Sequence, residues 1–292
     1  MRFLVGHAAS ATSSSPNLYV VEGEQAFNVT EADPSIGVDL AGVVTGGVEA
    51  IAKVEAARKT TSSVPVSSLT PALPLSRPGK IICLGLNYAD HAKEGGHDVP
   101  DYPALFMRGA TTLVPAEGPV VRPDCSERLD YEVELMVVIG KGGRHISEAD
   151  ALSHIFGYSV FNDVSVRDYQ RKTHQWTPGK NFDNTGPLGP YVVTPDELPP
   201  GAEGLKVETR LNGEVMQHAT TSDMIFKVAP TIAILSEFTT LEAGDLIAMG
   251  TPEGVGHARK PPVWMRPGDR IEVEVENIGV CANPVVAESD LR

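Results

Sequence analysis

Two glutamates on one short segment are the first residues whose type and spacing could do chemistry. Glu132 and Glu134 lie in residues 130–139, whose run of Val, Leu, Met and Ile is typical of a β-strand. Side chains at i and i+2 of a strand share a face, so both carboxylates are expected to point the same way. On a solvated edge strand this costs little. In a buried strand the pair requires a protonated carboxyl, an Arg or Lys partner, or a divalent cation.

A third carboxylate follows a second apolar run. Residues 157–162 predict a hydrophobic strand, and Asp163 comes directly after it. Three carboxylates from two strands suit a hard cation such as Mg²⁺, Mn²⁺ or Ca²⁺. Zinc favours His and Cys ligands, which this set lacks. Glu132, Glu134 and Asp163 are therefore the candidate metal ligands.

A histidine and a glutamate form the next candidate group. Residues 85–94 follow an expected strand and look like the entry to a helix, which places His91 and Glu94 three positions apart on one helical face. The carboxylate could then orient the imidazole as a general base for a water molecule. The alternative is an exposed helical ion pair, which is common and weak.

Two loops add a cation and a hydroxyl. Lys180 lies in residues 175–190, a loop dense in Gly and Pro, where it could neutralise an oxyanion or a substrate carboxylate. Thr251 lies in the turn of residues 250–256, whose hydroxyl and backbone N–H groups could bind an anion. Both segments could equally be ordinary connections with a solvated lysine.

The elements that must position these residues are mostly strands. Short β-branched runs separated by Gly and Pro predict a mainly β protein with some α-helix. Helical periodicity is clearest over residues 48–58, 147–154 and 225–238. Because helices and strands do not alternate regularly, the pattern disfavours a Rossmann sheet or an α/β barrel. The expected strands are residues 81–84, 132–139, 158–161, 207–211, 246–249 and 271–275.

The chain divides into three parts by composition. Residues 1–60 combine short strands with one helix and are expected to form a small N-terminal domain. Residues 61–79 are rich in Ser, Thr and Pro, with prolines too close together for a regular element, so they predict an extended connector. Residues 80–292 carry all the candidate chemistry and are expected to form a catalytic domain.

Composition excludes several classes of partner. A formal net charge of -14 and a pI near 5.0 argue against binding nucleic acid or an anionic membrane surface. The three cysteines are far apart and form no metal or disulfide pattern, which favours a reducing compartment. No secretory signal and no apolar run of about 20 residues is found, so we expect a soluble cytoplasmic protein.

The chain resembles the fumarylacetoacetate hydrolase family, and its pattern is most similar to the bacterial acylpyruvate and diketo-acid hydrolases. The resemblance extends over residues 80–285 and implies a mixed β-sandwich roll with its site at one end, usually in a homodimer. It rests on five motifs: Gly85-Leu-Asn-Tyr-Ala-Asp-His91, Asp130-Tyr-Glu-Val-Glu-Leu135, Asn162-Asp-Val-Ser-Val-Arg-Asp168, Gly179-Lys-Asn-Phe-Asp183 and Gly250-Thr-Pro-Glu-Gly-Val-Gly256.

The resemblance also implies roles for these residues. Glu132, Glu134 and Asp163 match the metal ligands, with Mg²⁺ or Mn²⁺ as the expected cofactor and Ca²⁺ as a further candidate. His91 with Glu94 matches a water-activating dyad. Lys180 is expected to assist catalysis, and Thr251 and Arg167 are expected to contact substrate. Arg108 stands where many relatives carry Lys, and its planar guanidinium would suit a substrate carboxylate.

The function expected from the resemblance is hydrolysis of a carbon–carbon bond in a 2,4-dioxo acid, which gives a 2-oxo acid such as pyruvate and a carboxylic acid. The cation would stabilise the enolate that leaves, while His91 activates water. Decarboxylation, tautomerisation or hydration of a 2-oxo acid uses the same enolate chemistry and is the alternative. A non-catalytic metal-stabilised binding protein is a third reading. Residues 95–104 and 167–177 are candidate lids.

Overall fold

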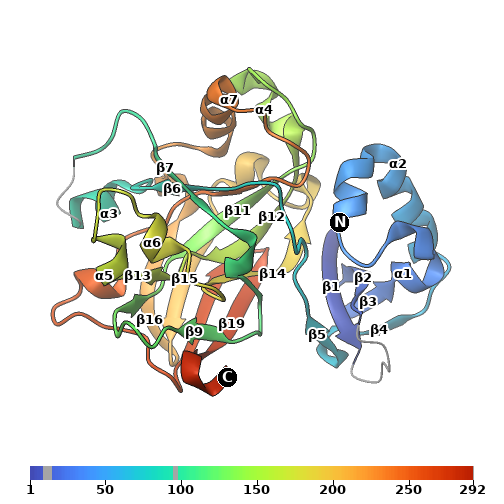
Figure 1. The fold of residues 1–292 in the computed structure, drawn as a ribbon. Helices are drawn as coiled ribbons and strands as arrows, with labels where there is room; N and C mark the ends of the chain where they lie inside the picture. Colours follow the sequence, from blue (N-terminus) through green and yellow to red (C-terminus); the bar gives the residue numbers. More distant parts are fainter. Residues whose placement is uncertain (9–14, 95–97, 292) are drawn as a thin grey trace.

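The structure is a computed structural model that describes residues 1–8, 15–94 and 98–291, and these residues form a mainly β protein with short helices (Figure 1). One large sheet runs through the whole molecule, and its β-branched strands agree with the runs predicted from sequence. In order across the described residues its strands are β4 (Ser63–Pro65), β3 (Gln25–Asn28), β2 (Asn17–Glu22), β1 (Arg2–Ala8), β14 (Gly186–Val193), β12 (Ile155–Asn162), β11 (Val133–Ile139), β17 (Leu246–Ala248), β6 (Ile81–Gly85) and β7 (Ala104–Arg108), with β5 (Leu69–Pro71) beside β1 and β8 (Leu113–Pro115) beside β14.

A second sheet packs against the part of the first that residues 80–292 form. Its buried residues alternate along the strands with charged residues, as expected for an antiparallel sheet with one solvated face. Its strands in order are β16 (Glu214–Thr220), β15 (Lys206–Leu211), β18 (Arg270–Val275), β19 (Gly279–Ala287) and β9 (Val120–Arg122), and a separate pair is formed by β10 (Leu129–Asp130) and β13 (Ser165–Val166).

Most helices are short, and the longest, α2 (Ala41–Arg58), packs against one face of the large sheet. The predicted helices over residues 48–58, 147–154 and 225–238 correspond to α2, α4 and α7. Three others, α3, α5 and α6, lie together at one end of the part formed by residues 80–292 (Figure 1). The α-helices of the described residues are α1 (Val29–Ala32), α2 (Ala41–Arg58), α3 (Ala89–Glu94), α4 (Glu148–Ala151), α5 (Arg167–Gln170), α6 (Thr177–Lys180) and α7 (Val228–Phe238).

The central strand β11 is buried on both faces. One face of β11 packs into the core between the two sheets, through Val133, Leu135 and Val137. Side chains of β15, β18 and β19 form the other half of this core. Met136 and Val138 point to the opposite face and pack in a second core with side chains from β1, β2 and α2. Strict alternation on a strand buried on both faces places Glu134 in an apolar layer, where a lone carboxylate would be costly.

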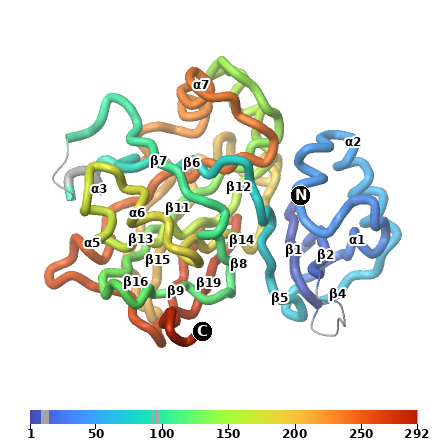
Figure 2. The backbone as a smooth tube through the Cα atoms, viewed as in Figure 1, coloured from blue at the N-terminus to red at the C-terminus, as the bar shows by residue number. Residues whose placement is uncertain are grey.

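The N-terminal part is joined to residues 80–292 through the sheet. Strand β1 pairs antiparallel with β14, with Phe3 opposite Val192, so residues about 190 positions apart lie side by side. The predicted connector also contributes strands, because β4 pairs with β3 and β5 pairs with β1. Figure 2 shows the blue N-terminal part at the right, with the chain after β5 crossing to β6. None of the described helices is long and apolar enough to cross a membrane.

Candidate active site

Three carboxylates meet at the end of β11 and β12. Strand β11 pairs antiparallel with β12, with Val133 opposite Asn162, and the backbone N–H of Asp163 donates to the Glu132 carbonyl at 2.9 Å. This pairing brings one oxygen from each of Glu132, Glu134 and Asp163 within 4.8 Å of one another. All three side chains are buried. The structure therefore assembles the three candidate metal ligands that the sequence predicted.

Three cationic side chains surround the carboxylates. The Lys180 ammonium donates to Glu132 Oε2 at 2.7 Å and to Asp163 Oδ2 at 2.5 Å. The Arg108 guanidinium pairs with Asp163, and Arg167 lies 2.6 Å from Glu132 Oε1. Glu132 and Asp163 each have two cationic partners, whereas none of these pairs involves Glu134.

The two glutamates consequently differ in acidity. Burial disfavours ionisation of Glu132, but the charges of Lys180 and Arg167 outweigh it and lower the pKa of this carboxyl. Burial, together with the negative charges of Asp163 and Glu132, raises the pKa of Glu134 well above its ordinary value. Burial would lower the pKa of Lys180, yet the adjacent carboxylates raise it, so its ammonium stays charged.

The residues present fit a divalent cation. Among the described residues, the only hydrogen bond to the Glu134 carboxylate comes from the Gly250 backbone N–H, at 2.8 Å. A carboxylate that is buried and has so few donors is under-compensated when ionised, and a cation beside it would remove that penalty. The donor set consists only of carboxylate oxygens, which Mg²⁺ and Mn²⁺ prefer.

A glycine allows this contact with Glu134. Gly250 follows β17 with φ of 85°, a backbone conformation that side chains disfavour, and an added Cβ would lie 2.8 Å from the Asn87 side chain. Asn87 in turn donates to the Met249 carbonyl at 2.7 Å and accepts from the Phe226 N–H. The parallel pairing of β6 with β17 thus brings the two loops that follow these strands together behind the site.

A cavity of about 500 Å³ opens over the carboxylates. Six of the nine predicted site residues line it, namely His91, Glu132, Glu134, Arg167, Lys180 and Thr251. Leu84 of β6, Phe106 of β7 and Trp176, just before α6, add apolar surface to the lining. The Phe106 and Trp176 rings meet edge to face at 5.7 Å. The lining of the cavity therefore combines charged and apolar side chains.

Arg108 does not line this cavity, although a substrate contact was expected there. Its guanidinium is fully buried behind Asp163 and donates to the Val164 carbonyl at 3.2 Å and to Thr185 Oγ1 at 2.7 Å. These bonds use the planar fork of the guanidinium to hold Asp163. In this geometry Arg108 supports a candidate metal ligand, and a substrate in the cavity would not reach it.

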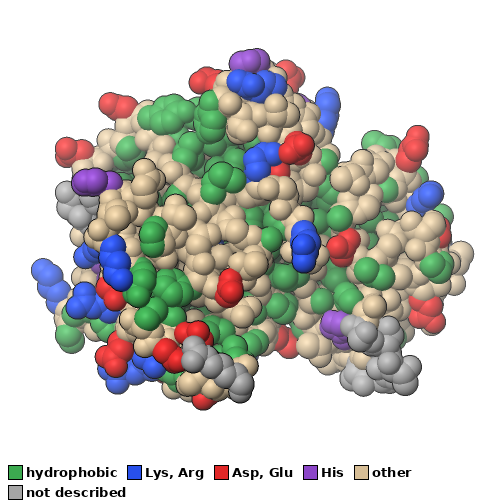
Figure 3. Space-filling view, in the orientation of Figure 1, with side chains coloured by type: hydrophobic (Ala, Val, Ile, Leu, Met, Phe, Trp, Pro, Cys, Tyr) green, Lys and Arg blue, Asp and Glu red, His purple; other side chains and the backbone are tan. Residues whose placement is uncertain are grey.

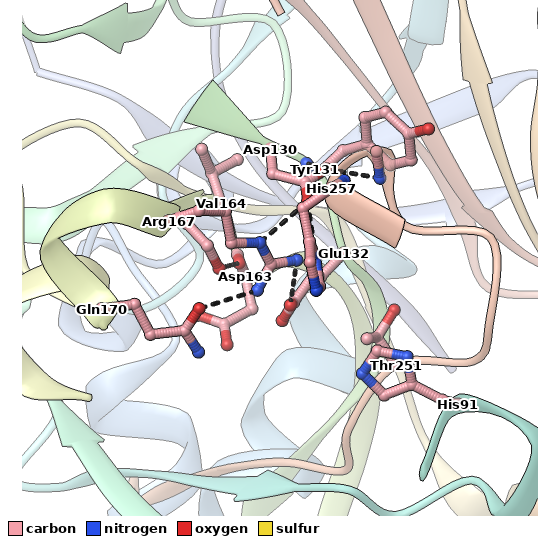
Figure 4. Close-up of polar contacts among 12 residues, drawn as sticks. His91, Asp130, Tyr131, Glu132, Asp163, Val164, Arg167, Gln170, Thr251 and His257 are labelled. Atoms are coloured by element: carbon pink, nitrogen blue, oxygen red, sulfur yellow. Dashed lines mark hydrogen bonds and ion pairs between the residues drawn. The ribbon is translucent and has the colours of Figure 1, made fainter. Parts of the chain in front are cut away.

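His91 and Glu94 lie together as the helical spacing predicted. His91 Nδ1 is 3.5 Å from Glu94 Oε2, and both oxygens of Glu94 accept the Gly254 N–H at 3.2 Å. The carboxylate is therefore fixed by the loop after β17. In Figure 4, His91 and Thr251 lie on one side of Glu132, and Gln170 lies on the other. Thr251 Oγ1 accepts from Gln217 Nε2 at 2.9 Å.

Two further residues of the site, Asp130 and His257, were not predicted from the sequence. Asp130 is fully buried and accepts from the Gly256 N–H at 2.7 Å, the His257 N–H at 2.9 Å and Arg167 Nε at 2.8 Å (Figure 4). Burial opposes its ionisation, but Arg167 and His257 lower its pKa. His257 Nδ1 lies 3.3 Å from Asp130 Oδ2, and the ring lines the cavity. Asp130 begins one of the five motifs and His257 directly follows another, and these positions were the only available signal.

The candidate lids border the site to different degrees. From residues 167–177, the side chains of Gln170, Arg171 and Trp176 line the cavity beside Arg167. The other candidate spans residues 95–104, of which 95–97 lie outside the described residues.

A mainly β fold with a buried carboxylate triad beside a charged cavity is the arrangement expected of an enzyme with a candidate metal site. Comparison with known proteins identifies the family. Residues 80–286 match the model described as fumarylacetoacetate (FAA) hydrolase C-terminal. The chain belongs to the fumarylacetoacetate hydrolase family.

Three relatives show how the family is represented among known proteins. The chain is 42% identical over 269 residues to human mitochondrial oxaloacetate tautomerase FAHD2A, covering 90% of this chain and 85% of that protein. It superposes on fumarylacetoacetate hydrolase from Exiguobacterium antarcticum with a TM-score of 0.85 and 34% identity, over 99% and 100% of the two chains. It also superposes on maleylpyruvate hydrolase from Sphingobium sp. SYK-6, whose structure was solved with manganese(II) and pyruvate. The TM-score is 0.81 and the identity 27%, over 98% of this chain and 99% of that chain.

Proposed function

We propose that this protein is a metal-dependent isomerase that interconverts the enol and keto forms of a small 2-oxo acid, with oxaloacetate as the first candidate substrate. The observation that carries the proposal is the buried triad of Glu132, Glu134 and Asp163, held beside Lys180 at the wall of a cavity. Similarity to a human protein named oxaloacetate tautomerase supports the reaction and the substrate. Hydrolysis, which the sequence resemblance favoured, becomes the second candidate.

A divalent cation bound at the triad would place positive charge next to the substrate oxygens and stabilise the negative charge of an enolate. Lys180 uses two of its three N–H bonds on Glu132 and Asp163, so the third can donate to a substrate carboxylate or oxo oxygen. Arg167 is held by Asp130 and keeps Glu132 in place. The apolar wall of Phe106 and Trp176 reduces access of water to the reacting atoms.

Tautomerisation moves one proton: the enol oxygen loses a proton and C3 gains one. No carbon–carbon bond breaks and no water is consumed. We assign the exchange of this proton at C3 to His91, which lines the cavity. Its Nδ1 faces Glu94, which leaves Nε2 for the substrate. Gly254 fixes Glu94, so the ring has a defined orientation before substrate enters.

Hydrolysis of an acylpyruvate is the second candidate because the same His91 and Glu94 pair could activate water. The similarity to maleylpyruvate hydrolase supports this candidate. The two reactions require the same enolate stabilisation and differ in whether a water molecule attacks a carbonyl carbon. They can therefore be separated by their products.

The test follows three products from the purified protein, first stripped of metal and then supplied with Mg²⁺ or Mn²⁺. We expect metal-dependent loss of the ultraviolet absorbance of enol-oxaloacetate, without release of carbon dioxide. Metal-dependent pyruvate release from an acylpyruvate, without tautomerisation, would move the assignment to the hydrolase. Carbon dioxide from oxaloacetate would move it to a decarboxylase. No turnover with any substrate would favour the non-catalytic metal-stabilised protein.

We also propose a homodimer and Mg²⁺ or Mn²⁺ as the metal. The assembly rests on the family resemblance, and light scattering on the purified protein tests it. Manganese is supported by its presence in the structure of maleylpyruvate hydrolase.

A cytoplasmic location remains a proposal, since the human relative is named as mitochondrial. Fractionation of the source cells tests it.

A further inference from the structure

A second cavity, of about 280 Å³, adjoins the first. The two share three wall residues, Arg167, Arg171 and His257, and the second adds Arg128, Pro262 and Trp264. Arg167, Arg171 and His257 therefore form a common wall between the site and this second space. The second cavity has two arginines at its rim and an aromatic side chain in its wall.

The arginines of this cavity are not equivalent. Arg167 is buried, and its charge is compensated by Asp130 and Glu132. Arg128 and Arg171 are exposed at the rim, and no other described residue donates to, accepts from or pairs with either guanidinium. Two free guanidinium groups beside one hollow are notable in a chain of net charge -14, because they create a local attraction for anions.

Other basic side chains lie on the same edge of the molecule. A further hollow, which shares Arg128 and Trp264 with the second cavity, is also lined by Arg122, Arg266 and one acidic residue, Glu127. Figure 3 shows Lys and Arg side chains gathered on the edge where α5 and the loop after β17 lie. Anionic molecules would thus be attracted toward this opening.

We propose that Arg171 and Arg128 bind the distal carboxylate of the substrate, so that the enzyme selects 2-oxo acids that carry a second carboxylate. This inference rests on the proposed function and adds the residues that set substrate choice. The oxo-acid end lies against Lys180 and the triad, and the chain of the substrate extends between Arg167 and His257. A guanidinium fork matches a carboxylate in shape and charge, which a point charge does not.

His257 has a supporting role in this arrangement. Its Nδ1 faces Asp130, so the ring presents its other nitrogen to the shared wall of the two cavities. Trp264 offers an apolar surface for methylene groups between the two carboxylates of a longer acid. The subsite is therefore expected to accept dicarboxylic acids longer than oxaloacetate as well as oxaloacetate itself.

The kinetic test compares R171Q and R128Q with the wild type on oxaloacetate and on a 2-oxo acid that has only one carboxylate. Each variant is expected to raise KM for the dicarboxylic acid by about 10-fold or more, because one charge-assisted contact is lost. Little change in kcat is expected. The monocarboxylic acid should be unaffected. K172Q is the matched control, because Lys172 is adjacent and equally charged but lies over the Tyr169 ring and lines neither cavity.

A binding measurement separates this inference from the proposed reaction. Titration of the metal-loaded protein with pyruvate and with 2-oxoglutarate, which carries a carboxymethyl group that pyruvate lacks, needs no turnover. The wild type is expected to bind 2-oxoglutarate more tightly, and R171Q should lose that advantage while keeping its affinity for pyruvate. The inference would be overturned if R171Q lowered the affinity for both ligands equally, or if the wild type bound both with equal affinity. This holds whatever reaction the enzyme catalyses.

Discussion

Glu134 is the residue on which the chemistry of the site depends most directly. Its carboxylate is buried, receives one hydrogen bond from Gly250 among the described residues, and lies near two other carboxylates. These conditions raise its pKa and make the ionised form unfavourable in the metal-free protein. Lys and Arg side chains neutralise the charges of Glu132 and Asp163. The negative charge of Glu134 has no such partner among the described residues, so a divalent ion would neutralise it.

Replacing Glu134 by Gln is expected to affect metal binding more than folding. The amide keeps the shape of the side chain and removes a poorly compensated buried charge, so Tm of the metal-free protein should stay the same or rise. Affinity for Mn²⁺ should fall by at least about 10-fold, because a ligand is lost. Thermal melts and calorimetric titration measure both. A variant that Mn²⁺ stabilises as much as the wild type would show that Glu134 is not a ligand.

Replacing His91 by Ala tests the proton transfer. The ring touches the cavity and is held only by Glu94 in the described part of the chain, so the fold should tolerate its loss. Loss of a positioned acid–base group is expected to lower kcat by about 10²–10⁴-fold. Tm and metal affinity should be unchanged. Wild-type turnover of enol-oxaloacetate by H91A would exclude this histidine.

At the scale of elements, the loop after β17 organises the site. Its Gly250 donates to Glu134, Gly254 to Glu94 and Gly256 to Asp130, so three backbone N–H groups hold three carboxylates. This backbone contact explains why a turn rich in glycine occurs here. The sequence suggested an anion site at this turn, and the anions that it binds are side chains of the protein itself.

Gly256→Ala is expected to disrupt this loop. A Cβ at this position would lie 2.1 Å from the Val263 carbonyl oxygen and 2.6 Å from Asp130 Oδ1, so the backbone must shift. We expect a loss of about 1–3 kcal/mol of stability and a larger loss of activity, since Asp130 also holds Arg167. Chemical denaturation measures the first effect.

The control for that variant is Gly109→Ala. Gly109 has φ of -84°, and an added Cβ would meet its nearest neighbour, Asn181, at an ordinary 3.7 Å. Its stability should therefore stay within about 0.5 kcal/mol of the wild type. Equal stability of G256A and G109A would contradict the role given to Gly256.

Local patterns predicted the elements and the triad but not the contacts between distant segments. Glu132 and Glu134 could be placed on one face because a strand fixes side chains two apart. The positions of Arg108 and Asp130 depend on partners 55 and 126 residues away, Asp163 and Gly256, which no local pattern reveals. The pairing of β1 with β14, which makes one sheet of both parts, escaped sequence analysis for the same reason.

At the scale of the whole molecule, pH should couple stability to metal binding. The folded-state pKa of Glu134 is raised above its unfolded value, so the metal-free fold loses stability as pH rises through the ordinary carboxyl range toward the raised pKa. The pKa of Glu132 is lowered, so its contribution is present above the ordinary carboxyl pKa and is lost progressively as pH falls below it toward the lowered pKa. Metal binding requires both carboxylates to be ionised.

The increase in Tm that Mn²⁺ produces is therefore expected to grow as pH rises from the ordinary carboxyl range toward neutrality, as the proton on Glu134 is displaced more easily. Thermal melts across this range, with and without the metal, measure the effect. In E134Q the increase in Tm should be small and independent of pH. A constant increase in the wild type would contradict the raised pKa of Glu134.

The most direct test of the central claim is the rate at which enol-oxaloacetate converts to its keto form with metal-stripped protein, before and after addition of Mn²⁺ or Mg²⁺. We expect the stripped protein to be inactive, the metal to restore turnover in the wild type, and E134Q to remain inactive at the same metal concentration. Full activity of the stripped protein, or restoration of E134Q to the wild-type rate, would contradict a metal-dependent tautomerase built on Glu132, Glu134 and Asp163.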